Sequence, residues 1–187
     1  HELLAMGAAA VDALVGALPH KKNGWTAAKV LGQIGVATPT VISALRKRAD
    51  ELWFAMALGM LGDFEWLSKQ LPATAAYGLT APLKAITAGG TPRPLDYAPL
   101  EAWLATNPKG RSLVEQELAP GRSFVDVQPG DVDEAVRALS SPFAVVRWHA
   151  ASVLGARELG AAAGAKVLPA LAGVLGDKHA LVRRLAV

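Results

Sequence analysis

Residues 165–186, which read AKVLPALAGVLGDKHALVRRLA, contain the pattern that decides the fold class. Apolar residues recur at helical spacing over 165–175, which predicts a helix. The Gly-Asp pair at 176–177 predicts a turn, and residues 181–186 predict the start of a second helix. This stretch is therefore expected to form a helical hairpin.

The segment directly before it has the same arrangement. A helix is predicted over 132–139, a turn at the Ser-Pro pair 141–142, and a second helix over 145–155 (VVRWHAASVLG). A Val-Arg pair opens the second helix of both hairpins, at 146–147 and at 182–183. Two tandem hairpins with the same residues in the same places indicate a repeat architecture.

This pattern resembles the HEAT repeat, especially the short bacterial type that includes phycobilisome-lyase-type repeats. The family has a Pro in the first helix, an Asp at the turn, Val-Arg opening the second helix, and then Ala and Leu-Gly. The matching residues are Pro169, Asp177, Val182, Arg183 and Ala186 in one unit, and Val146, Arg147, Ala150, Leu154 and Gly155 in the other, with Ser141 in place of the Asp. The turn Asp can cap the second helix, and the Arg can reach turn groups of its own or a neighbouring repeat. The resemblance implies an α-solenoid.

The N-terminal third repeats the pattern. Helices are predicted over 8–18, 25–34, 39–48 and 51–61. Thr38 is expected to be the N-cap before Pro39 at the first helical position, and Asp50 is expected to cap the helix over 51–61. Leu-Gly pairs at 31–32, 58–59 and 154–155 bring the second helices into register.

The middle of the chain is less regular. Helices are predicted over 63–70, 73–88, 95–106 and 111–118, separated by a break at 89–94 and a loop at 120–130 with a short extended piece at 124–127. We therefore expect one all-α domain over 1–187, with regular repeats over 8–61 and 132–187 and degenerate repeats or an insertion over 62–131. Because the chain opens at His1 and closes inside a predicted helix, we also expect a fragment of a longer protein.

The resemblance implies that the second helices line the concave side of the solenoid, where binding would occur. At about 100° per residue, Val146, Ala150, Val153 and Leu154 face the core, which leaves the opposite side for a binding ridge. The Leu-Gly register then gives the candidate binding residues Trp25, Lys29, Trp53, Met56, Met60, Trp148, His149 and Ser152. Two alternatives stay open: the apolar helix over 51–61 is buried on both sides, or Trp25 and Trp148 pack between adjacent repeats.

Composition and motif spacing argue against several kinds of chemistry. The chain is 52% hydrophobic but only 6% aromatic and has no cysteine, which favours close-packed helices without disulfides or thiolate chemistry. The four His residues lack metal-ligand spacing, and no serine has the surroundings of a nucleophile elbow. We therefore expect no catalytic residues, metal or cofactor, and no residue marks bilin attachment. The apolar stretch 52–61 is too short to span a membrane, and without a secretory signal pattern we expect a cytoplasmic setting.

The leading functional hypothesis is a scaffold that binds a protein or peptide along the ridge. The alternative is a nucleic-acid-binding or HEAT-like DNA base-repair protein that uses the same ridge with Lys29, Arg147 and Arg183. The formal charge is only +3 and the cations are scattered, which is weak support for nucleic acid.

Overall fold

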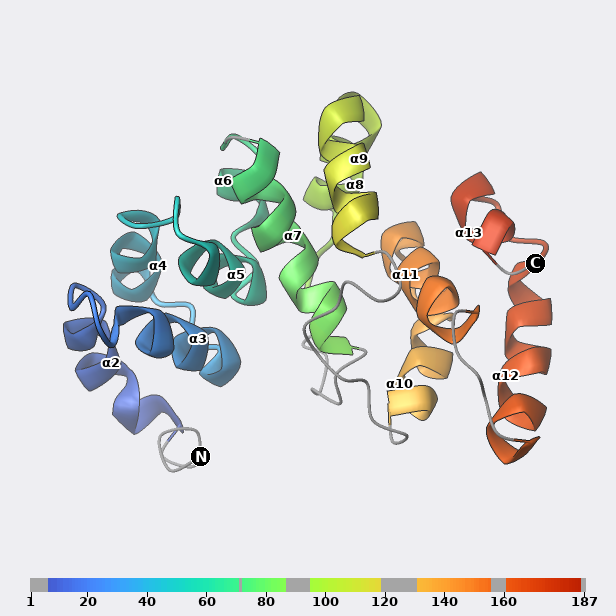
Figure 1. Ribbon diagram of the computed structural model, residues 1–187, viewed down its shortest axis with the longest axis horizontal. Helices are drawn as coiled ribbons and strands as arrows, with labels where there is room; N and C mark the ends of the chain where they lie inside the picture. Colours follow the sequence, from blue (N-terminus) through green and yellow to red (C-terminus); the bar gives the residue numbers. More distant parts are fainter. Residues whose placement is uncertain (1–6, 71, 87–94, 119–130, 156–160, 186–187) are drawn as a thin grey trace. The chain divides into compact units, whose positions relative to one another are not determined.

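The computed structural model of the chain describes residues 7–70, 72–86, 95–118, 131–155 and 161–185. Every regular element in these ranges is a helix, and no strand occurs among them (Figure 1). The predicted all-α class is therefore confirmed. The predicted break at 89–94 and loop at 120–130 lie outside the described residues.

The chain divides into two compact units. Unit 1 contains residues 1–82 and 102–114, and unit 2 contains residues 83–101 and 115–187. Three helices contribute residues to both units: α7 (Pro72–Ile86), α8 (Ala98–Thr106) and α9 (Pro108–Glu117). The expectation of one continuous repeat domain stays a prediction.

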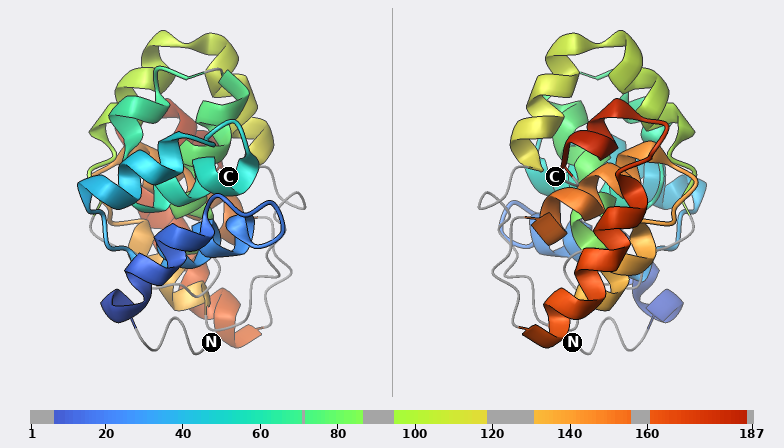
Figure 2. Two further views of the ribbon diagram at one scale, coloured as in Figure 1. Left: turned by 90° about the vertical axis from the view of Figure 1, so that its left-hand side faces the viewer. Right: turned by 90° about the vertical axis from the view of Figure 1, so that its right-hand side faces the viewer.

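Unit 1 begins with two stacked helical hairpins. Its elements before α7 are η1 (Gly7–Ala10), α2 (Val11–Ala17), α3 (Gly24–Ile34), α4 (Pro39–Arg46), α5 (Leu52–Met60) and the short α6 (Phe64–Leu67). Helix α2 packs against α3 and α4 against α5, while α2 also contacts α4 and α3 contacts α5. The hairpins can be followed in blue and cyan in Figure 1 and in the left view of Figure 2. First helices therefore stack on first helices, and second helices on second helices.

The predicted helix starts in unit 1 are partly confirmed. The backbone N–H of Val41 donates to the Thr38 hydroxyl at 3.3 Å, and Pro39 is the first helical residue, as expected. The predicted cap at Asp50 is wrong. Glu51 occupies the N-cap position of α5 without a side-chain capping bond, because its carboxylate accepts two hydrogen bonds from Arg48, at 2.5 and 2.8 Å.

Helix α3 packs against α5, and α5 packs against α7, at a glycine in each case. A Cβ placed on Gly32 in α3 would lie 3.1 Å from Cα of Ala57 in α5. A Cβ placed on Gly59 would lie 1.7 Å from the carbonyl oxygen of Gly78 in α7. The Leu that precedes each aligned Gly is buried at all three pairs, at positions 31, 58 and 154. The Leu of each pair thus fills the core. In two of the three pairs, at Gly32 and Gly59, the missing side chain lets the neighbouring helix pack closely.

Unit 2 contains a second pair of stacked hairpins. They are formed by α10 (Asp131–Ala138), α11 (Ala144–Gly155), α12 (Ala161–Val174) and α13 (Ala180–Leu185), seen in orange and red in the right view of Figure 2. Helix α11 contacts α10, α12 and α13, and α10 also contacts α12. These helices overlap the predicted positions of both C-terminal hairpins to within a few residues.

The turns of unit 2 are tied together by arginine. Arg147 donates to both carboxylate oxygens of Asp177, at 2.6 and 3.0 Å, and to the carbonyl oxygen of Ser141 at 2.8 Å. Arg183 donates at 2.6 Å to the carbonyl oxygen of Asp177, which likewise lies six residues earlier in the chain. Asp177 also accepts the backbone N–H of His179 at 2.8 Å. The expected reach of Arg147 to its own and the next turn is therefore confirmed.

Candidate binding ridge on helices α3 and α5

Three of the predicted binding residues come together on the surface of unit 1. The indole rings of Trp25 in α3 and Trp53 in α5 lie 5.8 Å apart between centroids, at an interplanar angle of 38°. The Lys29 ammonium nitrogen lies 5.5 Å from the centroid of the Trp53 ring, within the range of a cation–π contact. Trp25 is 44% exposed and Lys29 is exposed, so this cluster faces solvent.

Met56 and Met60 extend the cluster along α5. They follow Trp53 by three and seven residues, which places all three on one side of the helix. Trp53, Met56 and Met60 are each half-buried. We call the set Trp25, Lys29, Trp53, Met56 and Met60 the ridge.

The composition of α5 explains why the ridge is apolar. Its sequence LWFAMALGM contains no charged side chain, and its only side-chain hydrogen-bond donor is the Trp53 indole N–H. Phe54 and Leu58 fill the core and are fully buried. The remaining side of the helix keeps partial contact with solvent, and Leu52 at its start is 37% exposed. The alternative that α5 is buried on both sides is thus not what the structure shows.

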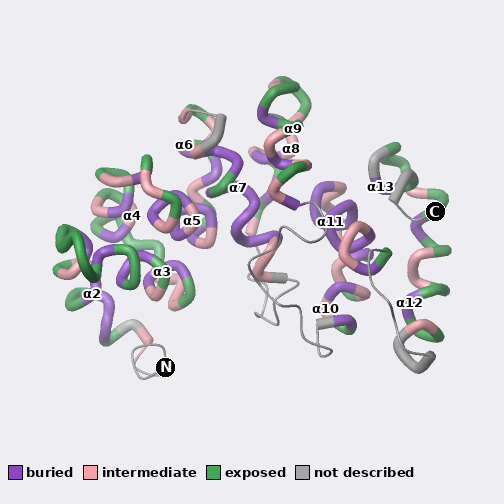
Figure 3. The backbone as a smooth tube through the Cα atoms, viewed as in Figure 1, coloured by how far each residue is buried: buried purple, intermediate pink, exposed green. Residues whose placement is uncertain are grey.

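The other three predicted binding residues lie in unit 2 and do not form a solvent-facing ridge. Trp148 is 7% exposed and His149 is 4% exposed, while Ser152 is half-buried. The expectation that this side of α11 faces solvent is therefore wrong for Trp148 and His149. The physical reason is that α11 has neighbours on several sides, and Figure 3 shows it as largely buried. Burial of Trp148 agrees with the alternative that it packs between helices.

The buried His149 has unusual protonation behaviour. Burial, reinforced by the nearby Lys84 ammonium, lowers the pKa of His149 to about 4, although a hydrogen bond with the Leu83 backbone acts in the opposite direction. The side chain is therefore neutral at physiological pH. Its neutral state lets it contribute to the core of unit 2 instead of to a charged surface.

We expect unit 2 to lose stability as pH falls from about 6.5 to about 4 because of His149. An unfolded His binds a proton below about pH 6.5, whereas the folded one does so only near pH 4, so the unfolded state gains the more protons across this window. The expected loss between pH 7 and pH 5 is roughly 2 kcal/mol. Urea denaturation of the parent and of His149→Gln at both pH values measures it. The glutamine variant should show a smaller pH effect, whereas His20→Gln, at an exposed position, should match the parent. If the parent, His149→Gln and His20→Gln lose the same stability between the two pH values, His149 is not the cause of the pH dependence.

The cations named for nucleic-acid binding are placed very differently. Lys29 belongs to the ridge and contacts the Trp53 ring. Arg147 is held by Asp177 and by two turn carbonyls, and Arg183 donates to the Asp177 carbonyl. These two arginines hold turns within unit 2, and of the three cations only Lys29 lies beside the Trp25–Trp53 pair.

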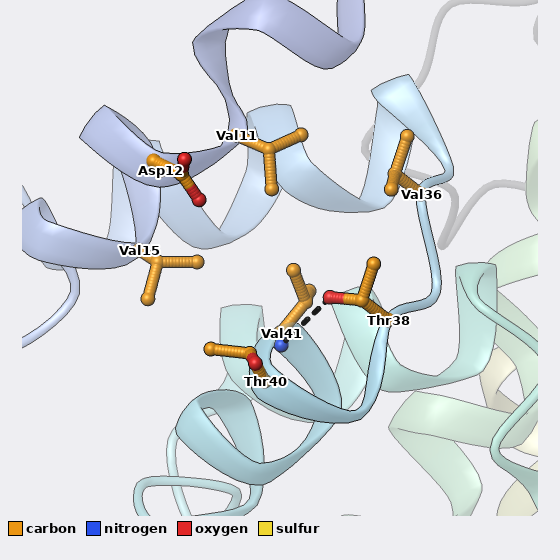
Figure 4. Close-up of a pocket in the computed structure, with 7 residues that line it drawn as sticks. All are labelled: Val11, Asp12, Val15, Val36, Thr38, Thr40 and Val41. Atoms are coloured by element: carbon orange, nitrogen blue, oxygen red, sulfur yellow. Dashed lines mark hydrogen bonds between the residues drawn. The ribbon is translucent and has the colours of Figure 1, made fainter.

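A separate small hollow lies between α2, the α3–α4 connection and α4. It has a volume of about 310 Å³, and Figure 4 shows the seven residues that line it: Val11, Asp12, Val15, Val36, Thr38, Thr40 and Val41. Asp12 is the only ionisable side chain in this lining. A lone carboxylate among Val and Thr side chains lacks the second group that acid–base or nucleophilic catalysis requires. The residues that line the hollow come from three segments and form no recognisable motif. For this reason the sequence did not indicate the hollow.

The remaining searches add no further site. Among the described residues, no three His, Asp or Glu side chains gather in a group that could hold a metal ion. None of the described helices combines the length and the apolar character needed to cross a membrane. In comparisons with known proteins, the chain matches no family model, no curated protein and no solved structure.

Proposed function

We propose that this chain is a helical scaffold that binds a protein or peptide on the ridge of α3 and α5. The observation that carries the proposal is the contact between the Trp25 and Trp53 rings on an open face, with Lys29 beside them. Large apolar side chains gathered on a surface mark interaction sites, and Trp is among the residues that most often dominate binding energy.

The methionines support an adaptable apolar contact. Met side chains are unbranched and polarisable, so they adjust to partners of different shape. Met56 and Met60 lie half-buried along the same side of α5 as Trp53. A surface of this kind suits the apolar face of a helix or an extended peptide better than a small polar ligand.

We further propose that the hairpins are HEAT-like repeats that continue as a solenoid. Two features support this proposal. First and second helices stack in separate layers within each unit. Arg147 and Arg183, which match the family arginine, make equivalent bonds to the carbonyl six residues earlier. In such an array α3 and α5 are second helices, the ones that line the binding side in that family.

The test is selection of binding peptides from a random library, followed by affinity measurement with single variants. Peptides selected on the parent should bind Trp53→Ala at least about tenfold more weakly, because a truncated hot-spot Trp typically costs 2 kcal/mol or more. Trp25→Ala should weaken binding similarly. Circular dichroism melts establish that both variants remain folded.

The matched control is Leu168→Ala. Leu168 is a large apolar side chain on α12 that is even more exposed than Trp25 and lies outside the ridge. This variant should keep parental affinity. Peptides that bind equally to the parent and to both Trp variants would overturn the proposal, as would binding that is lost only in Leu168→Ala. Retention of nucleic acid that washes off with salt would favour the nucleic-acid alternative instead.

A further inference from the structure

Three lysines lie on or directly before α3, the helix that carries Trp25. Lys21 and Lys22 lie in the turn directly before α3, and Lys29 lies on α3, all three exposed. Helices α3 and α5 contain no Asp or Glu. The two carboxylates that precede α5, Asp50 and Glu51, interact with Arg48. The ridge is thus bordered by cationic side chains.

Three other cations of unit 1 are paired within the unit, whereas these lysines, like Lys47 and Lys109, are not paired with any described residue. Arg46 is paired with Asp63 at 2.7 Å, Arg48 with Glu51 at 2.5 Å, and Lys69 with Glu65 at 2.8 Å. No described residue forms an ion pair with Lys21, Lys22 or Lys29. The positive charge beside the ridge is therefore not neutralised within the part of the unit that the structure describes.

The position of Lys29 makes this charge matter for binding. An apolar partner that covers the Trp53 ring also takes water from the Lys29 ammonium, which lies 5.5 Å from the ring centroid. Removing water from a charge costs free energy unless the partner supplies a new acceptor. A carboxylate on the partner supplies one, whereas a second cation adds repulsion.

The length of the ridge sets the size of the partner. Trp53, Met56 and Met60 are spaced at i, i+3 and i+7, a span of roughly 10 Å along the helix axis. This distance corresponds to about two turns of an opposing helix, whose apolar residues recur at the same spacing. Three lysines beside an apolar stripe fit such a helix better than a nucleic acid, which requires a longer cationic track.

We propose that the ridge binds an amphipathic helix that carries carboxylates beside its apolar face, and this inference rests on the proposed function. The apolar side chains of the partner lie against Trp25, Trp53 and Met56. Its carboxylates lie near Lys29 and the Lys21–Lys22 turn.

The test uses three model peptides of roughly 16 residues with the same Leu spacing, flanked by Glu, by Gln or by Lys. The Glu peptide should bind the parent at least tenfold more tightly than the Lys peptide, and added salt should reduce this difference. Lys29→Glu should weaken the Glu peptide at least tenfold and strengthen the Lys peptide. Lys47→Glu, which makes the same charge change at an exposed site after α4, should leave both affinities unchanged.

The outcomes separate this inference from the proposed function. If all three peptides bind equally and Trp53→Ala abolishes that binding, the ridge is a binding site but the preference for acidic partners is wrong. If no model peptide binds, the inference fails even when library peptides still select the ridge. If the Glu peptide binds Trp53→Ala as tightly as the parent, both proposals fail. An oligo(dT) strand that binds more tightly than the Glu peptide would also overturn the inference.

Discussion

Replacing Gly59 by alanine is expected to destabilise unit 1 by about 3 kcal/mol or more, the upper part of the range for overpacked cores. The added Cβ would lie 1.7 Å from the carbonyl oxygen and 2.6 Å from the carbonyl carbon of Gly78. Both obstacles are backbone atoms of α7, so α5 and α7 must move apart and lose packing. Helix propensity alone would favour alanine by about 1 kcal/mol, which means that the clash decides the sign.

Gly16→Ala is the matched control for this prediction. Gly16 lies on the exposed side of α2, and a Cβ there would meet no atom within 4 Å. This variant should be as stable as the parent or slightly more stable. Chemical denaturation monitored by tryptophan fluorescence compares the three proteins, since four of the five Trp residues lie in unit 1. A Gly59→Ala variant that unfolds at the parental midpoint would show that α5 and α7 are not in backbone contact.

Asp177→Asn is expected to destabilise unit 2 by about 3–5 kcal/mol, the usual cost of removing one partner from a buried ion pair. The side chains of Arg147 and Asp177 are only 9% and 8% exposed, and they are joined by two hydrogen bonds. Asparagine keeps the shape of the side chain but leaves the Arg147 charge without its counter-ion. The loss should lie near the lower limit because Arg147 keeps its two carbonyl acceptors.

Chemical denaturation followed by far-ultraviolet circular dichroism measures the effect, since the helices of unit 2 contribute to this signal. Asp133→Asn is the control, because Asp133 pairs with Lys166 at a position where both side chains are more than half exposed. Such exposed pairs contribute little to stability because water screens the charges. Similar losses in the two variants would contradict a special role for the buried pair.

The same pair has a defined pH dependence. The Arg147 guanidinium, together with the His179 backbone N–H, lowers the pKa of Asp177 to about 2. Because this folded-state pKa lies below the unfolded value, the stabilisation is complete above about pH 4 and is lost as pH falls toward 2. This pH window lies below the window of His149. Acid titration of Asp177→Asn and of His149→Gln can therefore separate the contributions of these two groups to the stability of unit 2.

Helix positions were largely predictable because helix formation depends on local residues. The apolar spacing over 165–175 and 145–155 predicted α12 and α11, and Thr38 with Pro39 marked the start of α4. The irregular middle was also predicted to be helical, and α6, α7, α8 and α9 lie close to the expected positions. Asp50 failed as a cap because Glu51, held by Arg48, occupies the N-cap position of α5.

The sequence by itself determined the helices, the hairpin turns and the side of each helix that carries large apolar residues, since these depend on spacing along one segment. Only the tertiary structure decided which of those sides remain open. Trp25 and Trp148 look equivalent in sequence, yet the first is exposed and the second is buried. Burial depends on how many neighbouring helices surround a segment, and the spacing within one helix carries no information about that number.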